Sequence, residues 1–352
     1  MTDTKKPAPN GWLILDKPRG LGSTQAVAAV KRNLRQGGYA KAKVGHGGTL
    51  DPLAEGVLPI ALGEATKLAG RMLDASKIYE FTVQFGEETD TLDTEGEVIA
   101  RSDHRPPMAA IAAVLEHFTG EIEQYPPAYS AVKIGGQRAY DRARAGEEVE
   151  TKVRLVTVYS LTRTVRPELV EGSNQRSART STGSARTDLG LDSTFTTTTG
   201  RPDPYDPGAP LELADAVSLT AHVSKGTYIR SLARDIAHAL GTVGHVTYLR
   251  RIKAGPFLEN QAISLDKLNE IGKGAPLQDL LLPLEAGLDD IPALKLDPDS
   301  AQAVRQGRVL SGMPQSDGLY CAMLDNVPVA LMELNAGTAK VVRGFNLPDV
   351  AE

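Results

Sequence analysis

Apolar residues follow two kinds of spacing along this chain, alternation with polar residues and recurrence at helical intervals. Alternation predicts strands at residues 79–85, 154–164 and 216–223, and a short continuous apolar run predicts a buried strand at 11–18. Helical spacing predicts helices at residues 23–34, 106–118 and 228–240, the first capped by Ser23 or Thr24. Strands outnumber helices and follow no regular βαβ order, so the pattern predicts an α+β fold with a mixed, largely antiparallel sheet.

The periodic pattern stops between residues 165 and 210. Residues 173–199 hold thirteen Ser or Thr residues, and four prolines follow. Because two alternating strands flank this stretch, we expect a disordered surface insertion in a hairpin loop, which a fold accommodates at small entropic cost. We divide the chain into a large domain of residues 1–285 and a small C-terminal β domain of residues 286–352.

Composition sets the cellular context that we expect. At 352 residues, 41% of them hydrophobic, the chain is long enough for a core in each of two domains. It shows neither an apolar run long enough to cross a membrane nor an apolar N-terminal signal, so we expect a cytoplasmic protein without a membrane partner. The single cysteine, Cys321, excludes an intrachain disulfide and a cysteine-based metal site.

The formal net charge of −5 hides an uneven distribution of charge. Residues 1–50 hold nine Lys or Arg against two Asp, and residues 221–255 hold six against one. Residues 256–352 are acidic, with seven basic and fourteen acidic side chains. Two basic segments on an otherwise acidic chain predict a surface that meets a polyanion such as RNA, although ordinary solvated charge would give the same counts.

The densest cluster of unusual residues is at positions 45–56, which read GHGGTLDPLAEG. Glycines allow tight turns there, and Pro52 fixes the backbone directly after Asp51. A carboxylate held in a rigid loop suits work as a nucleophile or general base. In an arbitrary sequence the same Asp-Pro pair more often makes a simple turn, in which Asp51 only caps the backbone.

These residues also carry a family resemblance, and three further segments carry it in the same order. Residues 45–67 resemble the signature of the TruB family, the bacterial tRNA pseudouridine-55 synthases. The second segment is Tyr79 with GEETDTLDTEG at residues 86–96. The third is PPAYSAVKIGGQRAYDRAR at residues 126–144, and the fourth is SKGTYIRSLARDIA at residues 224–237 with YLRR at residues 248–251. Four ordered matches across residues 10–255 are specific, and they imply a pseudouridine synthase catalytic domain followed by a small PUA-like β domain.

The resemblance implies an isomerisation that needs no cofactor and no metal. Uracil is detached from C1′, turned over and rejoined through C5. By similarity Asp51 is the catalytic nucleophile or base, and Arg230 keeps it ionised. Tyr79 stacks on the flipped base and assists removal of the C5 proton.

The same resemblance assigns the substrate-binding residues. Tyr228 and Leu249 line the base pocket, and His46 packs into the RNA loop. From their charge, Lys17, Arg19, Arg250 and Arg251 are also candidates for binding phosphate, which orients RNA without reading its sequence. Outside the family context each of these residues has a plainer interpretation as core or solvated surface.

The expected partner is the T-arm stem-loop of tRNA, bound by a monomer. Three other functions fit parts of the pattern. A pseudouridine synthase could act on another RNA site, and an RNA-binding or tRNA-folding module would leave Asp51 structural. A carboxylate-based hydrolase would need a second catalytic acid.

Overall fold

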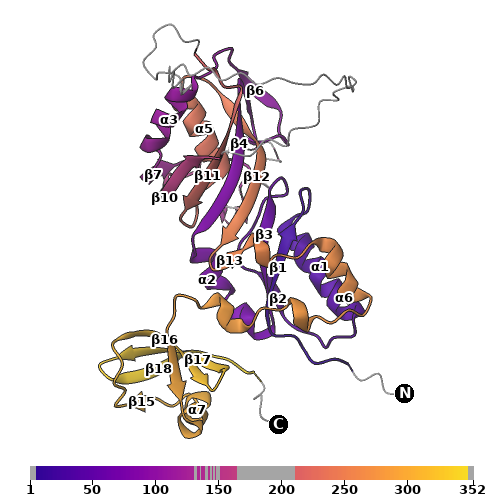
Figure 1. Cartoon of the computed structure of the whole chain (residues 1–352), viewed down its shortest axis with the longest axis vertical. Helices are drawn as coiled ribbons and strands as arrows, with labels where there is room; N and C mark the ends of the chain where they lie inside the picture. The colour runs from indigo at the N-terminus through magenta and orange to yellow at the C-terminus, as the bar shows by residue number, and fades with distance from the viewer. Residues whose placement is uncertain are drawn as a thin grey trace, which may run out of the picture. The chain divides into compact units, whose positions relative to one another are not determined.

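The computed structural model describes residues 5–130, 133–134, 136–138, 142, 145, 147, 151–164 and 211–347. The predicted disordered insertion at 165–210 therefore lies outside the described residues. A nine-stranded sheet has the order β1-β3-β12-β4-β11-β10-β7, with β2 beside β3 and β13 beside β12 (Figure 1). Its strands are β1 Gly11–Lys17, β2 Val44–His46, β3 Glu55–Leu62, β4 Lys77–Phe85, β7 Gly120–Gln124, β10 Arg154–Arg163, β11 Ala216–Val223, β12 Gly244–Ala254 and β13 Phe257–Leu258.

The sheet is largely antiparallel, as the alternation predicted. All its strand pairs are antiparallel except the short β3–β12 contact, which is parallel. The hairpin predicted around the insertion is confirmed, because β10 and β11 pair antiparallel. Two small ribbons add β5 Glu87–Thr89 with β6 Val98–Arg101, and β8 Lys133–Ile134 with β9 Gln137–Arg138.

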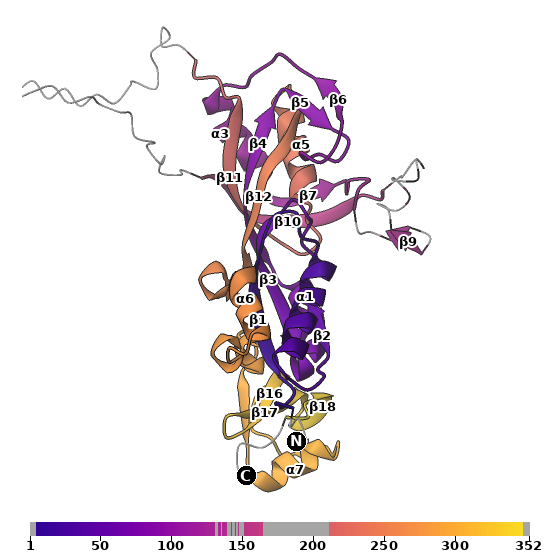
Figure 2. The same ribbon diagram turned by 90° about the vertical axis from the view of Figure 1, so that its right-hand side faces the viewer.

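Helices cover the sheet where their apolar stripes meet its alternate residues. Phe81, Val83 and Phe85 on β4 belong to the same buried cluster as Leu232 and Ile236 of α5. Figure 2 shows α1 close to β1, β2 and β3, at the other end of the sheet from α3 and α5. The helices are α1 Ser23–Gln36, α2 Ala69–Asp74, α3 Met108–His117, α5 Ile229–Ala239, α6 Leu265–Gly272 and α7 Pro298–Arg305.

The predicted cap of the first helix is wrong by one residue. Gly22 occupies the N-cap position, and its N–H donates to the Gln25 side chain at 2.8 Å. The Ser23 hydroxyl instead donates to the Leu50 carbonyl and accepts from the Leu50 N–H, both at 2.8 Å. A side chain that looked like a local cap thus binds a distant loop.

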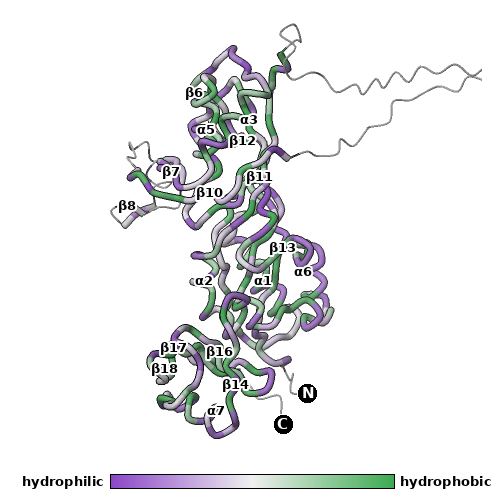
Figure 3. The backbone as a smooth tube through the Cα atoms, turned by 60° about the vertical axis from the view of Figure 1, so that its left-hand side comes forward, coloured by the Kyte–Doolittle hydropathy of each residue, from purple (hydrophilic) through white to green (hydrophobic). Residues whose placement is uncertain are grey.

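A second, five-stranded sheet occupies the C-terminal part of the chain, in the order β14-β16-β17-β18-β15. Its strands are β14 Ala293–Leu296, β15 Leu310–Ser311, β16 Gly318–Leu324, β17 Val327–Asn335 and β18 Thr338–Gly344. Helix α7 packs on this sheet over a core of its own that includes Leu294, Val304 and Met332. The apolar strand interiors stand out from polar turns in Figure 3. The small β domain has the expected architecture, while its PUA-like character and the boundary at residue 286 stay predictions.

None of the helices in the described ranges is long and apolar enough to cross a membrane.

Gly56 offers a direct test of how β3 meets β12. Its φ is +100°, and a Cβ there would collide with the Arg251 carbonyl oxygen of the neighbouring strand. We expect Gly56→Ala to lower the free energy of unfolding, measured in urea, by at least about 2 kcal/mol. Gly45→Ala is the matched control, because a Cβ at Gly45 meets nothing within 4 Å. Equal stability of the two variants would contradict this packing.

Candidate active site

The loop between β2 and β3 holds Asp51 in place from both flanks. Ser23 binds the preceding Leu50 through both backbone groups, and the following Pro52 accepts a hydrogen bond from the Gly20 N–H at 2.7 Å. The Ala54 N–H closes a turn onto the Asp51 carbonyl at 3.1 Å. These contacts fix the backbone but leave the Asp51 carboxylate 41% exposed. The loop therefore presents a positioned acid to solvent.

Arg230, in the first turn of α5, joins Asp51 to a second carboxylate. Its Nη2 donates to Asp51 Oδ2 at 2.8 Å, and its Nη1 donates to Asp93 Oδ2 at 3.0 Å. The carbonyl oxygens of Thr91 and Tyr129 accept further bonds at 2.8 and 3.0 Å. Burial alone would lower the pKa of Arg230, but the charges of Asp51 and Asp93 outweigh it and raise that pKa. The guanidinium therefore stays charged.

Asp93 was not predicted as a site residue, although it lies within the quoted GEETDTLDTEG segment. Its side chain is 2% exposed and also accepts hydrogen bonds from the Thr91 hydroxyl and the Glu95 N–H. The adjacent Leu92 has a φ of +62°, in the left-handed region that non-glycine residues seldom adopt. This turn points both Thr91 and Asp93 at the guanidinium.

Asp51 and Arg230 border a cavity of about 570 Å³, whose lining brings together most of the predicted residues. Tyr79 on β4, Tyr228 before α5 and Leu249 on β12 all contribute to its wall. Burial raises the pKa of Tyr228, so its phenol is protonated at neutral pH. The cavity combines a carboxylate, two phenol rings and an apolar side chain, which suits a flat, partly polar ring.

Lys17 and Arg251 are buried, whereas binding of phosphate would require them at the surface. Lys17 is fully buried, and its Nζ donates to the carbonyls of Pro18 and Leu21 at 3.0 and 2.7 Å. Arg251 is 1% exposed and donates to the carbonyls of Gly48, Thr49 and Val57. Donors that are committed to loop carbonyls inside the protein do not meet a phosphate at its surface. Both residues therefore position the loops around Asp51, which corrects the phosphate-binding expectation.

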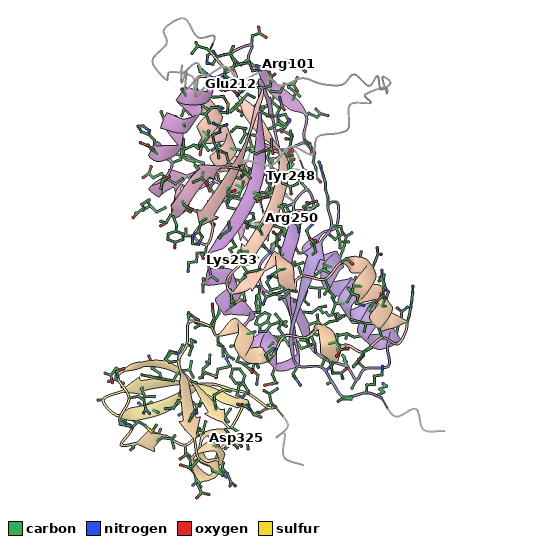
Figure 4. All side chains as sticks on the ribbon, in the orientation of Figure 1. Arg101, Glu212, Tyr248, Arg250, Lys253 and Asp325 are labelled. Carbon is green, nitrogen blue, oxygen red and sulfur yellow. The ribbon has the colours of Figure 1, made fainter. Side chains whose placement is uncertain are left out.

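Figure 4 labels Arg250 and Lys253 on β12, the strand that also carries Arg251. Arg250 forms ion pairs with Asp16, Glu55 and Glu259 at 3.1 to 3.4 Å. These partners hold its charge within the protein, so its expected role in phosphate binding loses support as well.

His46 is not among the cavity-lining residues. It lies on β2, where burial and then the charge of Arg251 lower its pKa, so the imidazole is neutral at neutral pH. Its Nδ1 is buried without a hydrogen-bond partner among the described residues. The contact of His46 with the RNA loop stays a prediction.

Lys77 borders the cavity and was also missed. Its Nζ donates to the carbonyls of Met72, Leu73 and Ala75 at 2.6 to 2.9 Å, at the end of α2. Burial, followed by the charge of Arg251, lowers its pKa to about 8. It precedes Tyr79 by two residues on β4, and this spacing puts both side chains on one face of the strand. Lys77 therefore anchors the end of the strand that carries Tyr79.

Within the described residues, no group of three or more His, Cys, Asp or Glu side chains has the arrangement of a metal site.

Comparisons with known proteins extend over almost the whole chain. A family model described as TruB family pseudouridylate synthase (N terminal domain) matches residues 35–173, and the tRNA pseudouridylate synthase B C-terminal domain matches residues 230–289. The chain is 62% identical over 343 residues to a tRNA pseudouridine synthase B of Novosphingobium aromaticivorans, covering 97% of this chain and 99% of the relative. It is 51% identical over 348 residues to one of Zymomonas mobilis, covering 98% and 100%.

A solved structure of an H/ACA RNP bound to a substrate RNA containing 2′-deoxyuridine includes a chain with the same fold. The TM-score is 0.63 at 23% identity, with 96% of this chain and 85% of that chain covered. The likeness shows that the two chains share this α+β fold. With the sequence identities above, the chain belongs to the TruB family.

Asp93 should matter for activity through Arg230. Asp93→Asn keeps the acceptor for the Glu95 N–H but removes the buried charge that holds the guanidinium. We expect the single-turnover rate of pseudouridine formation to fall by about 10- to 1,000-fold, with RNA affinity changed far less. Asp90→Asn, in the same loop but half-buried and bonded to the Glu97 N–H rather than to Arg230, should keep the wild-type rate. A normal rate in Asp93→Asn would exclude this positioning role.

The buried charge of Lys77 predicts a pH dependence of stability. Its pKa is about 8 in the folded protein, against 10.5 for an ordinary lysine, so the unfolded chain binds more protons between these values. The contribution of Lys77 to the free energy of unfolding must therefore rise as the pH rises from about 8 to 10.5. Urea titrations of the wild type and Lys77→Met should show a difference that grows in favour of the wild type. A difference independent of pH would contradict the lowered pKa.

Proposed function

We propose that this protein converts uridine-55 in the T-arm loop of tRNA into pseudouridine. The observation that carries the proposal is the half-exposed Asp51 carboxylate, held by Arg230 at the wall of a cavity with two tyrosines. Two relatives that are 62% and 51% identical to this chain over nearly its full length are named tRNA pseudouridine synthase B. The site and the family point to the same substrate class.

The reaction conserves every atom of the nucleotide. The N1–C1′ bond breaks, the uracil turns over, and C5 bonds to C1′; the C5 proton then leaves and N1 regains a proton. A uracil in an RNA loop is stacked, so the nucleotide must first leave the stack at a cost of about a few kcal/mol. In our proposal the everted base enters the cavity and stacks on Tyr79, with Tyr228 and Leu249 as the remaining walls.

Within this proposal Asp51 is the nucleophile or base at the nucleoside. Arg230 Nη2 donates to its carboxylate at 2.8 Å, which orients the carboxylate and places a fixed positive charge beside it. Tyr79 assists removal of the C5 proton. His46 packs into the RNA loop from β2, outside the cavity wall.

The T-arm hairpin is the part of tRNA that we propose the monomeric protein recognises, in the cytoplasm. Single-stranded loops expose base faces for stacking, which suits the two tyrosines of the cavity. The small C-terminal sheet, proposed as PUA-like, is the candidate for additional RNA contacts.

Hydrolysis of a nucleoside has less support. It would need a second carboxylic acid that can donate a proton to the leaving group. Asp93 is the nearest second carboxylate to Arg230, yet it is 2% exposed and committed to that guanidinium. An RNA-folding module without chemistry would have no need for an exposed carboxylate in a positioned loop.

Replacing the carboxylate separates catalysis from binding. Asp51→Asn should abolish tritium release from a T-arm hairpin labelled at C5 of the target uridine, while tRNA affinity stays within about threefold. In a strain that lacks the gene, pseudouridine at position 55 should disappear, and the wild-type gene should restore it where Asp51→Asn does not. Turnover by Asp51→Asn would exclude the catalytic assignment. An intact position 55 in the deletion strain would place the reaction on another RNA.

A further inference from the structure

The basic N-terminal segment is only partly used by the active site. Residues 17–50 contain seven Lys or Arg and no Asp or Glu. Lys17 points inward to loop carbonyls, and Arg19 donates to the Thr94 hydroxyl at 2.8 Å. Among the others, Lys31, Arg32, Arg35 and Lys41 are exposed and do not line the cavity.

Six exposed cations lie around the C-terminal half of α1, and we call them the α1 basic face. Lys31, Arg32 and Arg35 are one helical turn or less apart on the exposed side of α1. Arg32 and Lys273, at the end of α6, line one surface hollow together with Asn33, Asn269 and Gln36. The full set is Lys6, Lys31, Arg32, Arg35, Lys41 and Lys273.

Backbone contacts bring Lys6 to this face. The Lys6 N–H donates to the Gly38 carbonyl at 2.9 Å, and the Ala40 N–H donates to the Lys6 carbonyl at 2.8 Å. The Lys6 ammonium lies 4.8 Å from the centre of the Tyr39 ring. Tyr39 is buried and accepts a hydrogen bond from the Leu277 N–H at 2.9 Å. The N-terminal segment and the loop after α1 are thus fixed against each other.

The charge of this face has little opposition. Among the residues that the structure describes, none of the six cations has a carboxylate within ion-pair distance. Glu270 on α6 is paired with Lys267 at 2.7 Å, and the charge of Lys273 also helps to lower the pKa of its carboxyl. Figure 3 shows the hydrophilic colouring of α6 and its surroundings. Six like charges on a protein of net charge −5 repel one another, and a polyanion would relieve that repulsion.

The length of α1 sets the distance between this face and the loop that holds Asp51. Ser23, at the start of α1, holds Leu50 next to Asp51. At about 1.5 Å per residue, Arg32 and Arg35 lie roughly 13 and 18 Å along the helix from Ser23. This exceeds the Debye length of about 8 Å at physiological salt, so the face acts by direct contact rather than on the ionisation of Asp51.

We propose that the α1 basic face binds the phosphate backbone of the substrate tRNA outside the hairpin loop that enters the cavity. The inference rests on the proposed function for the identity of the RNA. Its contacts are electrostatic and carry no sequence information, so they add affinity and orientation.

Charge removal on α1 tests the inference. In Lys31→Ala/Arg32→Ala/Arg35→Ala the helix is retained, because alanine has the highest helix propensity. At 0.15 M salt we expect the Kd for intact tRNA to rise by about tenfold to hundredfold, and the salt slope to become shallower by about 2 to 3. Affinity for a short single-stranded RNA with only the loop nucleotides should not change. Lys31→Arg/Arg32→Lys/Arg35→Lys keeps the charge and should bind tRNA like the wild type.

The outcomes separate this inference from the proposed function. A tRNA Kd within twofold of the wild type, with an unchanged salt slope, would overturn the α1 basic face. An equal loss for tRNA and the loop fragment would also overturn it, because the charges would then act at the cavity. Binding is measured without turnover, so a wild-type protein that binds tRNA but forms no pseudouridine would contradict only the proposed function.

Discussion

The site depends on one buried arginine shared between two carboxylates. Removing a guanidinium from water is costly unless several charge-assisted bonds replace its hydration. Arg230 obtains these from Asp93, Asp51 and two backbone carbonyls. Asp93 is buried with it, whereas Asp51 is 41% exposed. The buried partner therefore anchors the arginine, and the arginine positions the exposed carboxylate through its hydrogen bond to Asp51.

The sheet brings these three residues together from distant parts of the chain. In the chain, Asp51 precedes β3 and Asp93 follows β5. Arg230 lies in the first turn of α5, the helix that follows β11. The central pairing of β4 with β11 and β12 closes the distance between these segments. Inward-pointing Lys17, Lys77 and Arg251 then satisfy the carbonyls of the surrounding loops. The sheet thus brings three residues that are distant in the sequence into one compact site.

Local patterns predicted the elements well, because alternation and helical spacing reflect burial directly. The strands of β4, β10 and β11 and the helix α5 lie within a few residues of their predicted positions. The function of individual cations was harder to predict, since a lysine that binds loop carbonyls and one that faces solvent look alike in a sequence. Lys17 and Arg251 were assigned to phosphate for that reason, and burial corrects both. Asp93 escaped notice because its role exists only through a partner 137 positions away.

The central claim is that Asp51 meets an everted uridine beside Arg230 and Tyr79. The most direct measurement is a crystal structure of Asp51→Asn bound to a T-arm hairpin. We expect the target base in the cavity against the Tyr79 ring, and the side chain of residue 51 within about 3.5 Å of the reacting nucleoside, still bonded to Arg230. A target base that stays stacked in the RNA loop, with the cavity facing away from it, would contradict the account.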